Sequence, residues 1–111
     1  MRTVVTSRHF KAHKTLVAYA ERQAERLEHY YDGIIKCQII LKFEKTRDSD
    51  KIAEVIASVY NARLTGVAHS RDFFKSIDAA ISKVTSQLKK YKEKLRTKDK
   101  KAVRRVRSKA V

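Results

Sequence analysis

The lysines and arginines near the C-terminal end of the chain give the strongest indication of a binding function. Residues 83–111 hold thirteen Lys and Arg but only two acids, Glu93 and Asp99. The whole chain of 111 residues carries a formal charge of +15, so this segment supplies most of the excess. Because so many like charges repel one another, the excess indicates an anionic partner, such as nucleic acid, an anionic membrane surface or an acidic protein.

One long helix is expected to present many of these cations. Apolar residues recur at alternating intervals of three and four at Phe74, Ile77, Ile81, Val84, Leu88, Tyr91 and Leu95. This spacing predicts a helix from about Asp72 to Arg96 that buries one stripe, with Asp72 as its N-cap. The solvent side of this helix then carries Lys75, Lys83, Lys89, Lys90, Lys92, Lys94 and Arg96.

These cations do not stabilise the helix enough to explain why they are there. Lys90 and Lys94 form a like-charge pair four residues apart, and such pairs destabilise a helix by about 0.2–0.5 kcal/mol each. A membrane-surface helix would leave its apolar face free for lipid, whereas this stripe is needed to cover a sheet. Nucleic acid is therefore the expected partner, since lysine ammonium groups meet phosphates along a backbone.

The remaining elements predict an α+β fold in which one sheet carries both helices. β-Branched composition and period-two alternation predict strands at 2–7, 34–45, 51–60 and 62–70, with a polar turn at 46–50. A helical period predicts a helix from Lys14 to Tyr31, which Gly33 is expected to end with a positive φ. The order β-α-β-β-β-α fits a four-stranded sheet with two helices packed on one face. Its first two strands should run parallel if they are neighbours.

The sequence gives little indication of a metal, cofactor or catalytic site. Cys37 is the only cysteine and falls on the inward face of its strand, so an inert thiol and a reducing cytosol are expected. The four histidines have no ligand-like spacing, and no glycine-rich phosphate loop or nucleophile elbow occurs. No metal, cofactor or catalytic residue is expected, and the chain is not expected to be an enzyme. The N-terminal residues lack the apolar region of a signal peptide, and the longest apolar run, 16–20, is too short for a membrane span.

Three stretches resemble the ribosome hibernation promoting factors, also called ribosome-associated translation inhibitors: LVAYAERQAERLEHYYD at 16–32, IILKFEK at 39–45 and RDFFKSIDAAISKVTSQLKKYKEKL at 71–95. In the third stretch Asp72, Phe74, Ile77 and Asp78 match the family's opening of aspartate, an aromatic and then isoleucine-aspartate. The resemblance spans residues 1 to about 96 and depends on the order and spacing of the three stretches in a basic chain of this length.

The resemblance implies a fold similar to double-stranded-RNA-binding domains, and it implies a mechanism. Family members lodge between the head and body of the small ribosomal subunit, contact ribosomal RNA through both helices, and occupy the space of messenger RNA and tRNA anticodon stems. The chain is thus expected to be a bacterial, cytoplasmic, ribosome-associated inhibitor that is monomeric when free. Its expected partners are ribosomal RNA and ribosomal proteins, with no membrane and no small-molecule substrate. The positions that match the family's contact residues are Arg26, Lys42, Lys45, Lys83, Gln87, Lys90 and Lys94, with Arg22 beside a frequently basic position.

The chain also departs from the family's pattern. His13 stands where threonine or serine commonly caps the first helix. Only fifteen residues follow Arg96, so a short form is expected, in which residues 1–96 bind the ribosome and 97–111 form a basic tail that is mobile when unbound. The tail adds Arg104, Arg105 and Arg107 as candidate RNA contacts. Two alternatives remain, a free-standing duplex-RNA-binding protein and a regulator with an acidic protein partner.

Overall fold

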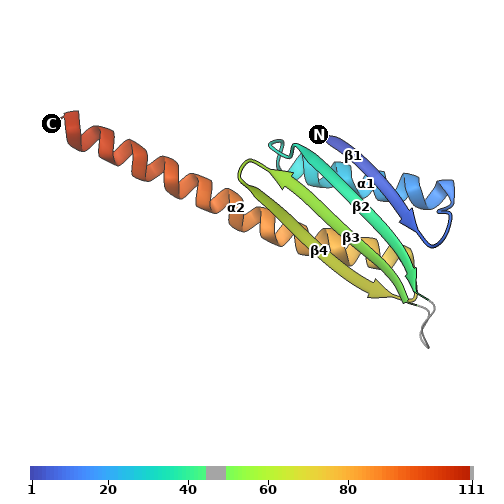
Figure 1. Ribbon diagram of the computed structural model, residues 1–111. Coiled ribbons are helices and arrows are strands. Elements are labelled where there is room, and N and C mark those ends of the chain that lie inside the picture. Colours follow the sequence, from blue (N-terminus) through green and yellow to red (C-terminus); the bar gives the residue numbers. More distant parts are fainter. Residues whose placement is uncertain (45–49, 111) are drawn as a thin grey trace.

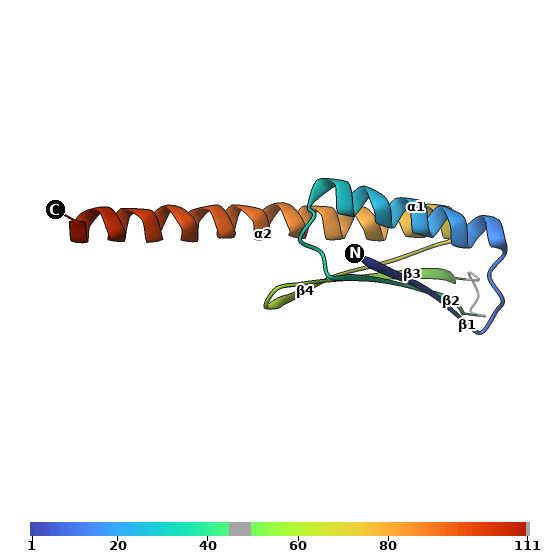
Figure 2. The ribbon, with the colours of Figure 1, turned by 90° about the horizontal axis from the view of Figure 1, so that it is seen from above.

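The six elements form one sheet with two helices on the same face. The computed structural model describes residues 1–44 and 50–110, with the backbone alone over 97–110. The elements are β1 (Arg2–Arg8), α1 (Lys14–Tyr30), β2 (Lys36–Glu44), β3 (Asp50–Val59), β4 (Ala62–Ser70) and α2 (Phe73–Ala110). Strand order is β1-β2-β3-β4, with β1 parallel to β2 and the other pairs antiparallel. Both helices cover one face (Figure 1; Figure 2), which confirms the predicted architecture. The other face is called the open face below.

The core lies between the sheet and the helices and follows the sequence alternation. The inward residues of the two central strands are buried, and they are Cys37, Ile39 and Leu41 on β2 and Ala53, Val55, Ala57 and Val59 on β3. Alanines on β3 leave room for α2, whose Ile77, Val84 and Leu88 are fully buried against the sheet. Phe43 and Leu64 are only partly buried at the margin of this core. The period-two pattern therefore predicted the buried face of β2, β3 and β4.

The start of α2 differs from the prediction at its first aromatic residue. The spacing places Phe74 in the buried stripe, but Phe74 is 39 % exposed, whereas Phe73 is buried. The ring of Phe73 stacks on Phe10 of the β1–α1 loop, with centroids 4.7 Å apart. The predicted N-cap is confirmed, because Asp72 Oδ1 accepts a hydrogen bond from the Phe74 amide at 2.9 Å.

The end of α2 lies beyond the predicted boundary at Arg96. The helical backbone continues to Ala110 and projects past the sheet (Figure 1). Residues 97–110 contain neither proline nor glycine and are rich in lysine, arginine and alanine, which are good helix formers. Helix propensity alone therefore accounts for the continuation of α2 over 97–110, where the sequence has no periodic apolar stripe to pack on the sheet. The side chains of Arg104, Arg105 and Arg107 lie outside the described residues.

The ends of α1 are built differently from the expectation. His13 caps the helix, since its Nδ1 accepts a hydrogen bond from the Thr15 amide at 3.2 Å. The predicted positive φ at Gly33 is wrong, because neither glycine has one. The chain leaves the helix through Tyr31, which has an extended backbone, with φ −149° and ψ 115°. A Cβ at Gly33 would meet the far end of the Tyr31 ring, so a larger residue there requires that side chain to move.

The segment joining β2 to β3 lies largely outside the described residues. The predicted polar turn covers 46–50, of which only Asp50 is described, as the first residue of β3. Lys45, a candidate RNA contact, also falls in this gap. Within the described part of the chain, neither helix is both long and apolar enough to cross a membrane.

Candidate RNA-binding surface

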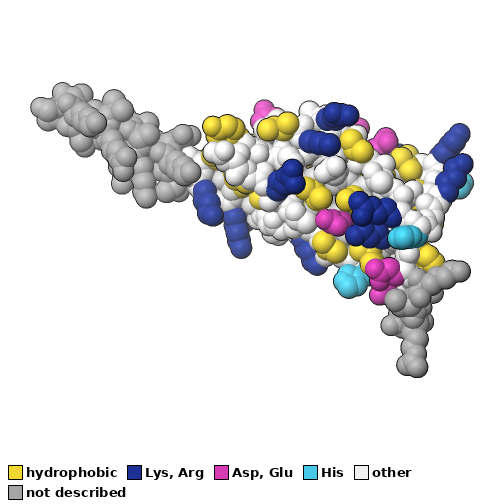
Figure 3. Space-filling view, in the orientation of Figure 1, with side chains coloured by type: hydrophobic (Ala, Val, Ile, Leu, Met, Phe, Trp, Pro, Cys, Tyr) yellow, Lys and Arg dark blue, Asp and Glu magenta, His cyan; other side chains and the backbone are white. Residues whose placement is uncertain are grey.

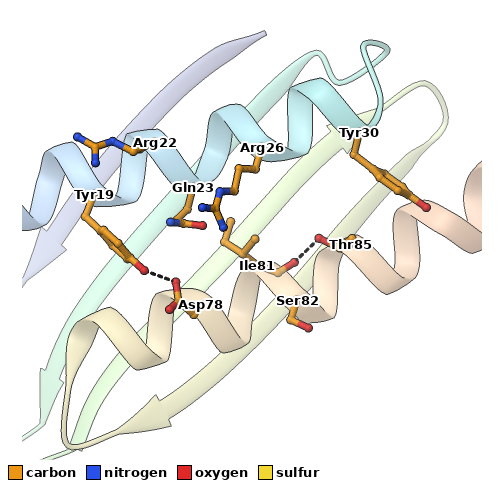
Figure 4. Close-up of a pocket in the computed structure, with 9 residues that line it drawn as sticks. All are labelled: Tyr19, Arg22, Gln23, Arg26, Tyr30, Asp78, Ile81, Ser82 and Thr85. Carbon is orange, nitrogen blue, oxygen red and sulfur yellow. Dashed lines mark hydrogen bonds between the residues drawn. The ribbon is translucent and has the colours of Figure 1, made fainter.

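An open groove of about 500 Å³ runs between α1 and α2 on the side away from the sheet (Figure 4). Arg22 and Arg26 line it from α1, as do Tyr19, Gln23 and Tyr30. The α2 wall consists of Asp78, Ile81, Ser82 and Thr85. The structure therefore brings the two arginines predicted on the first helix alongside the second helix. Two guanidinium groups beside small hydroxyl side chains form a polar, cationic surface that can hold phosphate oxygens.

One hydrogen bond between the helices crosses the groove at its end near the start of α2. The Tyr19 hydroxyl donates to Asp78 Oδ1 at 2.6 Å (Figure 4). This bond to the carboxylate raises the pKa of Tyr19 above its usual value, and partial burial adds to the effect. The Tyr19 ring also meets Phe74 edge-on, with centroids 4.9 Å apart. Asp78 thus links the two helices and fixes their spacing at this end of the groove.

Polar side chains flank the buried stripe of α2 on both sides. The row toward α1, with intervals of four and three, is Asp78, Ser82, Thr85, Lys89, Lys92 and Arg96. The row toward β4, with the same intervals, is Lys83, Gln87, Lys90 and Lys94. Residues spaced in this way share one side of a helix. These rows are called the α1-side row and the β4-side row below. Only Lys75, among the predicted cations of α2, belongs to neither row.

Two members of the β4-side row bond directly to the edge of the sheet. Lys83 Nζ donates to the Val67 carbonyl at 2.5 Å. Gln87 Nε2 donates to the Thr65 carbonyl at 2.6 Å, and Gln87 Oε1 accepts from the Thr65 amide at 3.2 Å. These bonds satisfy backbone groups on the unpaired side of an edge strand. The resemblance predicts both residues as RNA contacts, but the structure gives their side chains a role in the fold.

Lys92 joins the α1-side row to the end of α1. Its ammonium lies 4.6 Å from the centroid of the Tyr30 ring and donates to the Tyr30 carbonyl at 3.1 Å. The cation therefore covers one face of the ring and also satisfies a carbonyl in the last turn of α1. Lys92 was predicted as one of the solvent-facing cations of this helix, but its contact with Tyr30 was not predicted. The helical interval from Thr85 and Lys89 to Lys92 was the available signal.

Lys42 lies apart from the other candidates. It belongs to the open face of the sheet, and its ammonium sits 3.9 Å from Glu54 Oε2, with the Lys42 side chain 31 % exposed. Since the helices cover the opposite face, Lys42 cannot contribute to the groove. Lys75, Lys89, Lys90, Lys94 and Arg96 are exposed on α2.

The described residues give little indication of a reactive cysteine or a metal site. Burial raises the pKa of the Cys37 thiol to about 11, as its inward position predicted. No cluster of three or more histidine, cysteine, aspartate or glutamate side chains able to hold a metal occurs in 1–44 or 50–96. The distinctive feature of the surface is therefore its paired cationic helices.

The family can be assigned from the sequence. The family model described as "Sigma 54 modulation protein / S30EA ribosomal protein" matches residues 3–96, and the chain belongs to this family. The ribosome hibernation promoting factor of Escherichia coli strain K12 is 30 % identical over 97 residues, which cover 86 % of this chain and 98 % of that protein. The protein of the same name from Pseudomonas putida strain KT2440 is 29 % identical over 94 residues, which cover 85 % and 89 %. The resemblance inferred from the three stretches is thereby confirmed, as is the expectation that the chain is not an enzyme.

Solved structures agree with the fold. A ribosomal subunit interface protein from Coxiella burnetii superposes with a TM-score of 0.75 at 25 % identity, covering 84 % of this chain and 99 % of that one. The N-terminal domain of Thermus thermophilus Protein Y gives a TM-score of 0.72 at 20 % identity, with 82 % and 99 % covered. The second likeness supports the fold alone. The family match ends at residue 96, so the last turns of α2 lie beyond the region that it covers.

Proposed function

We propose that this chain is a ribosome hibernation factor that binds ribosomal RNA of the small subunit and sterically blocks the channel for messenger RNA and tRNA. The observation that carries the proposal is the placement of Arg22 and Arg26 along a groove whose α2 wall includes Ser82 and Thr85. The cations Lys89, Lys92 and Arg96 continue the same row of α2 beyond the groove. Its relatives in Escherichia coli and Pseudomonas putida are named for ribosome hibernation. Residues 1–96 form the ribosome-binding part, and the chain acts in the bacterial cytoplasm as a monomer when free.

The physical basis of the proposal is recognition of RNA by backbone and shape. Cations on two helices that share one side of the molecule can meet phosphates from neighbouring strands, and they need not read bases. Exposed lysines such as Lys90 and Lys94 adapt to variable phosphate positions, while Arg22 and Arg26 add forked contacts. If six to ten phosphates are contacted, the affinity should fall by about 10³–10⁵ between 50 and 200 mM salt.

Sedimentation with purified ribosomal subunits tests the proposal. The chain should move with vacant small subunits at low salt, and messenger RNA together with tRNA should displace it. A chain that stays at the top of the gradient even in dilute buffer is not a ribosome-binding factor. Equal binding to any duplex RNA, with no competition by messenger RNA and tRNA, would instead identify a general duplex-RNA-binding protein.

A charge-reversed pair on α2 locates the contact surface. The change Lys89→Glu with Arg96→Glu reverses two exposed cations of the α1-side row. It should abolish co-sedimentation while the melting temperature stays close to that of the parent chain. The matched control is Arg8→Glu with Lys11→Glu, which reverses two exposed cations away from the groove. This control should keep most of the binding. Loss of binding in the control alone would move the contact surface away from α2.

A further inference from the structure

The open face carries a row of cations at the end of the sheet where α2 departs. Strand pairing places Arg2 beside Lys36, Lys36 beside Ser58 and Ser58 beside Arg63. Residues paired in this way point to one face, and Lys36 precedes the inward-facing Cys37. The four side chains therefore form one line across the open face, roughly 14 Å long at the usual strand spacing. Three of the four are cations, and this line is called the cation line below.

The carboxylates of the open face lie away from the cation line. Glu44 pairs with Asp50 at the opposite end of the sheet. Figure 3 shows acidic side chains among the basic ones on this face. Glu54 lies four residues from Ser58 along β3, a distance of roughly 13 Å. Its carboxylate is already next to Lys42. Arg8 and Lys42 share that end of the open face with the carboxylates, whereas no carboxylate of the described open face lies beside the cation line.

An aromatic ring is displayed beside this line on a fixed turn. Tyr60 and Asn61 form the two-residue connection between the paired residues Val59 and Ala62, and Asn61 takes a φ of 62°. The Tyr60 residue is 74 % exposed. Its carbonyl accepts a hydrogen bond from the Tyr91 hydroxyl at 2.9 Å, which ties the turn to α2. The ring of Tyr60 thus projects into solvent from a backbone held at both the sheet and the helix.

We propose that Tyr60 and the cation line bind an unpaired segment of RNA, with a base stacked on Tyr60 and phosphates held by Arg2, Lys36 and Arg63. The inference rests on the proposed function for its partner class but uses the face opposite to the groove. Exposed aromatic rings beside a cationic track are typical of single-strand binding surfaces, because every base offers a ring face for stacking. A continuous duplex offers no free base face, so the partner is an unpaired strand.

The chain would then hold two RNA segments on opposite faces. The groove between the helices takes a structured backbone, and the tip of the β3–β4 turn takes a loop or a free strand. The positive charge of the cation line supplies the complementarity that selects RNA here. An acidic protein segment could satisfy the same charges, but it would gain nothing from a base-stacking ring.

Binding to two oligonucleotides distinguishes the contribution of base stacking from that of phosphate charge. The full chain is titrated into a labelled single-stranded RNA of about twelve nucleotides, and into a strand of equal length that lacks its bases. The parent chain should prefer the base-bearing strand. Tyr60→Ala should weaken binding to that strand by about five- to a hundredfold and leave the abasic strand unchanged. Tyr60→Phe should keep the preference, and Arg63→Ala should weaken both strands.

The controls keep the inference separate from the proposed function. Tyr30→Ala removes the other exposed tyrosine near cations and should leave the base preference in place, since Lys92 covers one face of that ring. The proposal is overturned if Tyr60→Ala keeps the base preference, if Tyr30→Ala removes it, or if polyglutamate competes as well as RNA. A chain that ignores ribosomes yet shows the Tyr60-dependent preference would overturn the hibernation function alone.

Discussion

Gln87 on α2 closes two hydrogen bonds with the backbone of Thr65 on β4, at 2.6 Å through its Nε2 and at 3.2 Å through its Oε1. The amide side chain therefore replaces a neighbouring strand at this point of the sheet edge. It holds α2 in a defined position along β4, and it blocks pairing of the edge with another chain. Together with the buried Leu88 and the bond from Tyr91 to the Tyr60 carbonyl, this attachment positions the cations farther along α2.

Replacing Gln87 should destabilise the edge of the sheet. We expect Gln87→Ala to lower the free energy of unfolding by about 1–2 kcal/mol, because two partly exposed hydrogen bonds are removed. Hydrogen exchange at the Thr65 amide should accelerate, and urea unfolding measures the change in free energy. Lys90→Ala, on the same row but without this bond, is the control. Unchanged protection at Thr65 would contradict the assignment.

Gly66 should not tolerate even one added methyl group. A Cβ at this position would lie 2.5 Å from the Ala80 carbonyl oxygen, 3.0 Å from Lys83 Cβ and 3.2 Å from Val84 Cγ2. Because the first of these atoms belongs to the α2 backbone, the helix must move away from β4. We expect Gly66→Ala to destabilise the chain by about 1–3 kcal/mol, as overpacked cores do. Thr65→Ala, at an exposed neighbour, should change thermal melting far less.

Neutralising the groove arginines should change the salt dependence of RNA binding. Arg22→Gln with Arg26→Gln removes two cations that line the groove. The slope of log affinity for the small subunit against log salt should become shallower by about two, one for each phosphate that is no longer neutralised. Arg8→Gln with Lys11→Gln removes equal charge elsewhere and should leave the slope close to that of the parent chain. Equal slopes in both variants would place the RNA away from the groove.

The bond between Tyr19 and Asp78 should make a stability contribution that disappears in alkali. Tyr19→Phe should cost about 0.5–1 kcal/mol near neutral pH, since the bond is solvent-exposed. The pKa of Tyr19 is raised from 10.0, so its contribution is full below pH 10 and is lost as the pH rises through the higher folded value. Denaturant titrations at pH 7 and above pH 10 measure this difference. Thr65→Ala, which removes no titratable group, should show the same pH dependence as the parent chain.

The Cys37 thiol should be unreactive in the folded chain. Burial raises its pKa from 9.0 to about 11, so little thiolate exists near pH 8 and the sulfur is enclosed. A thiol reagent should label the chain only after addition of denaturant. The same shift stabilises the fold below pH 9, and this contribution is lost as the pH rises through about 11. Rapid labelling without denaturant would show that β2 opens readily.

Alternation and helical period were sufficient to predict the sheet and the side on which it is covered. In β2 and β3, alternate residues must be apolar because one face is buried, so Cys37, Ile39 and Val55 could be assigned from spacing alone. The parallel pairing of β1 with β2 follows from the helix that joins them. The basic helix and the arginines of α1 could likewise be located from their positions along the chain.

Spacing could not predict contacts made between distant segments. Phe73 and Phe74 both fit a three-to-four interval, and only the distant ring of Phe10 decides which is buried. Lys83 and Gln87 look like solvent-facing polar residues until the edge of β4 is placed beside them. Periodicity could not single out Tyr60, because its exposure results from the turn between β3 and β4.

The uninterrupted course of α2 has a kinetic consequence. The helix that contributes Val84 and Leu88 to the core is the same helix that ends at Ala110, with no break between them. While the helix stays intact, its outer turns therefore cannot detach and rebind independently of the sheet, as a tethered peptide would. If a ribosomal partner binds both ends of the molecule, release requires both contacts to break together. The bound fraction should then decay as a single slow exponential during dissociation.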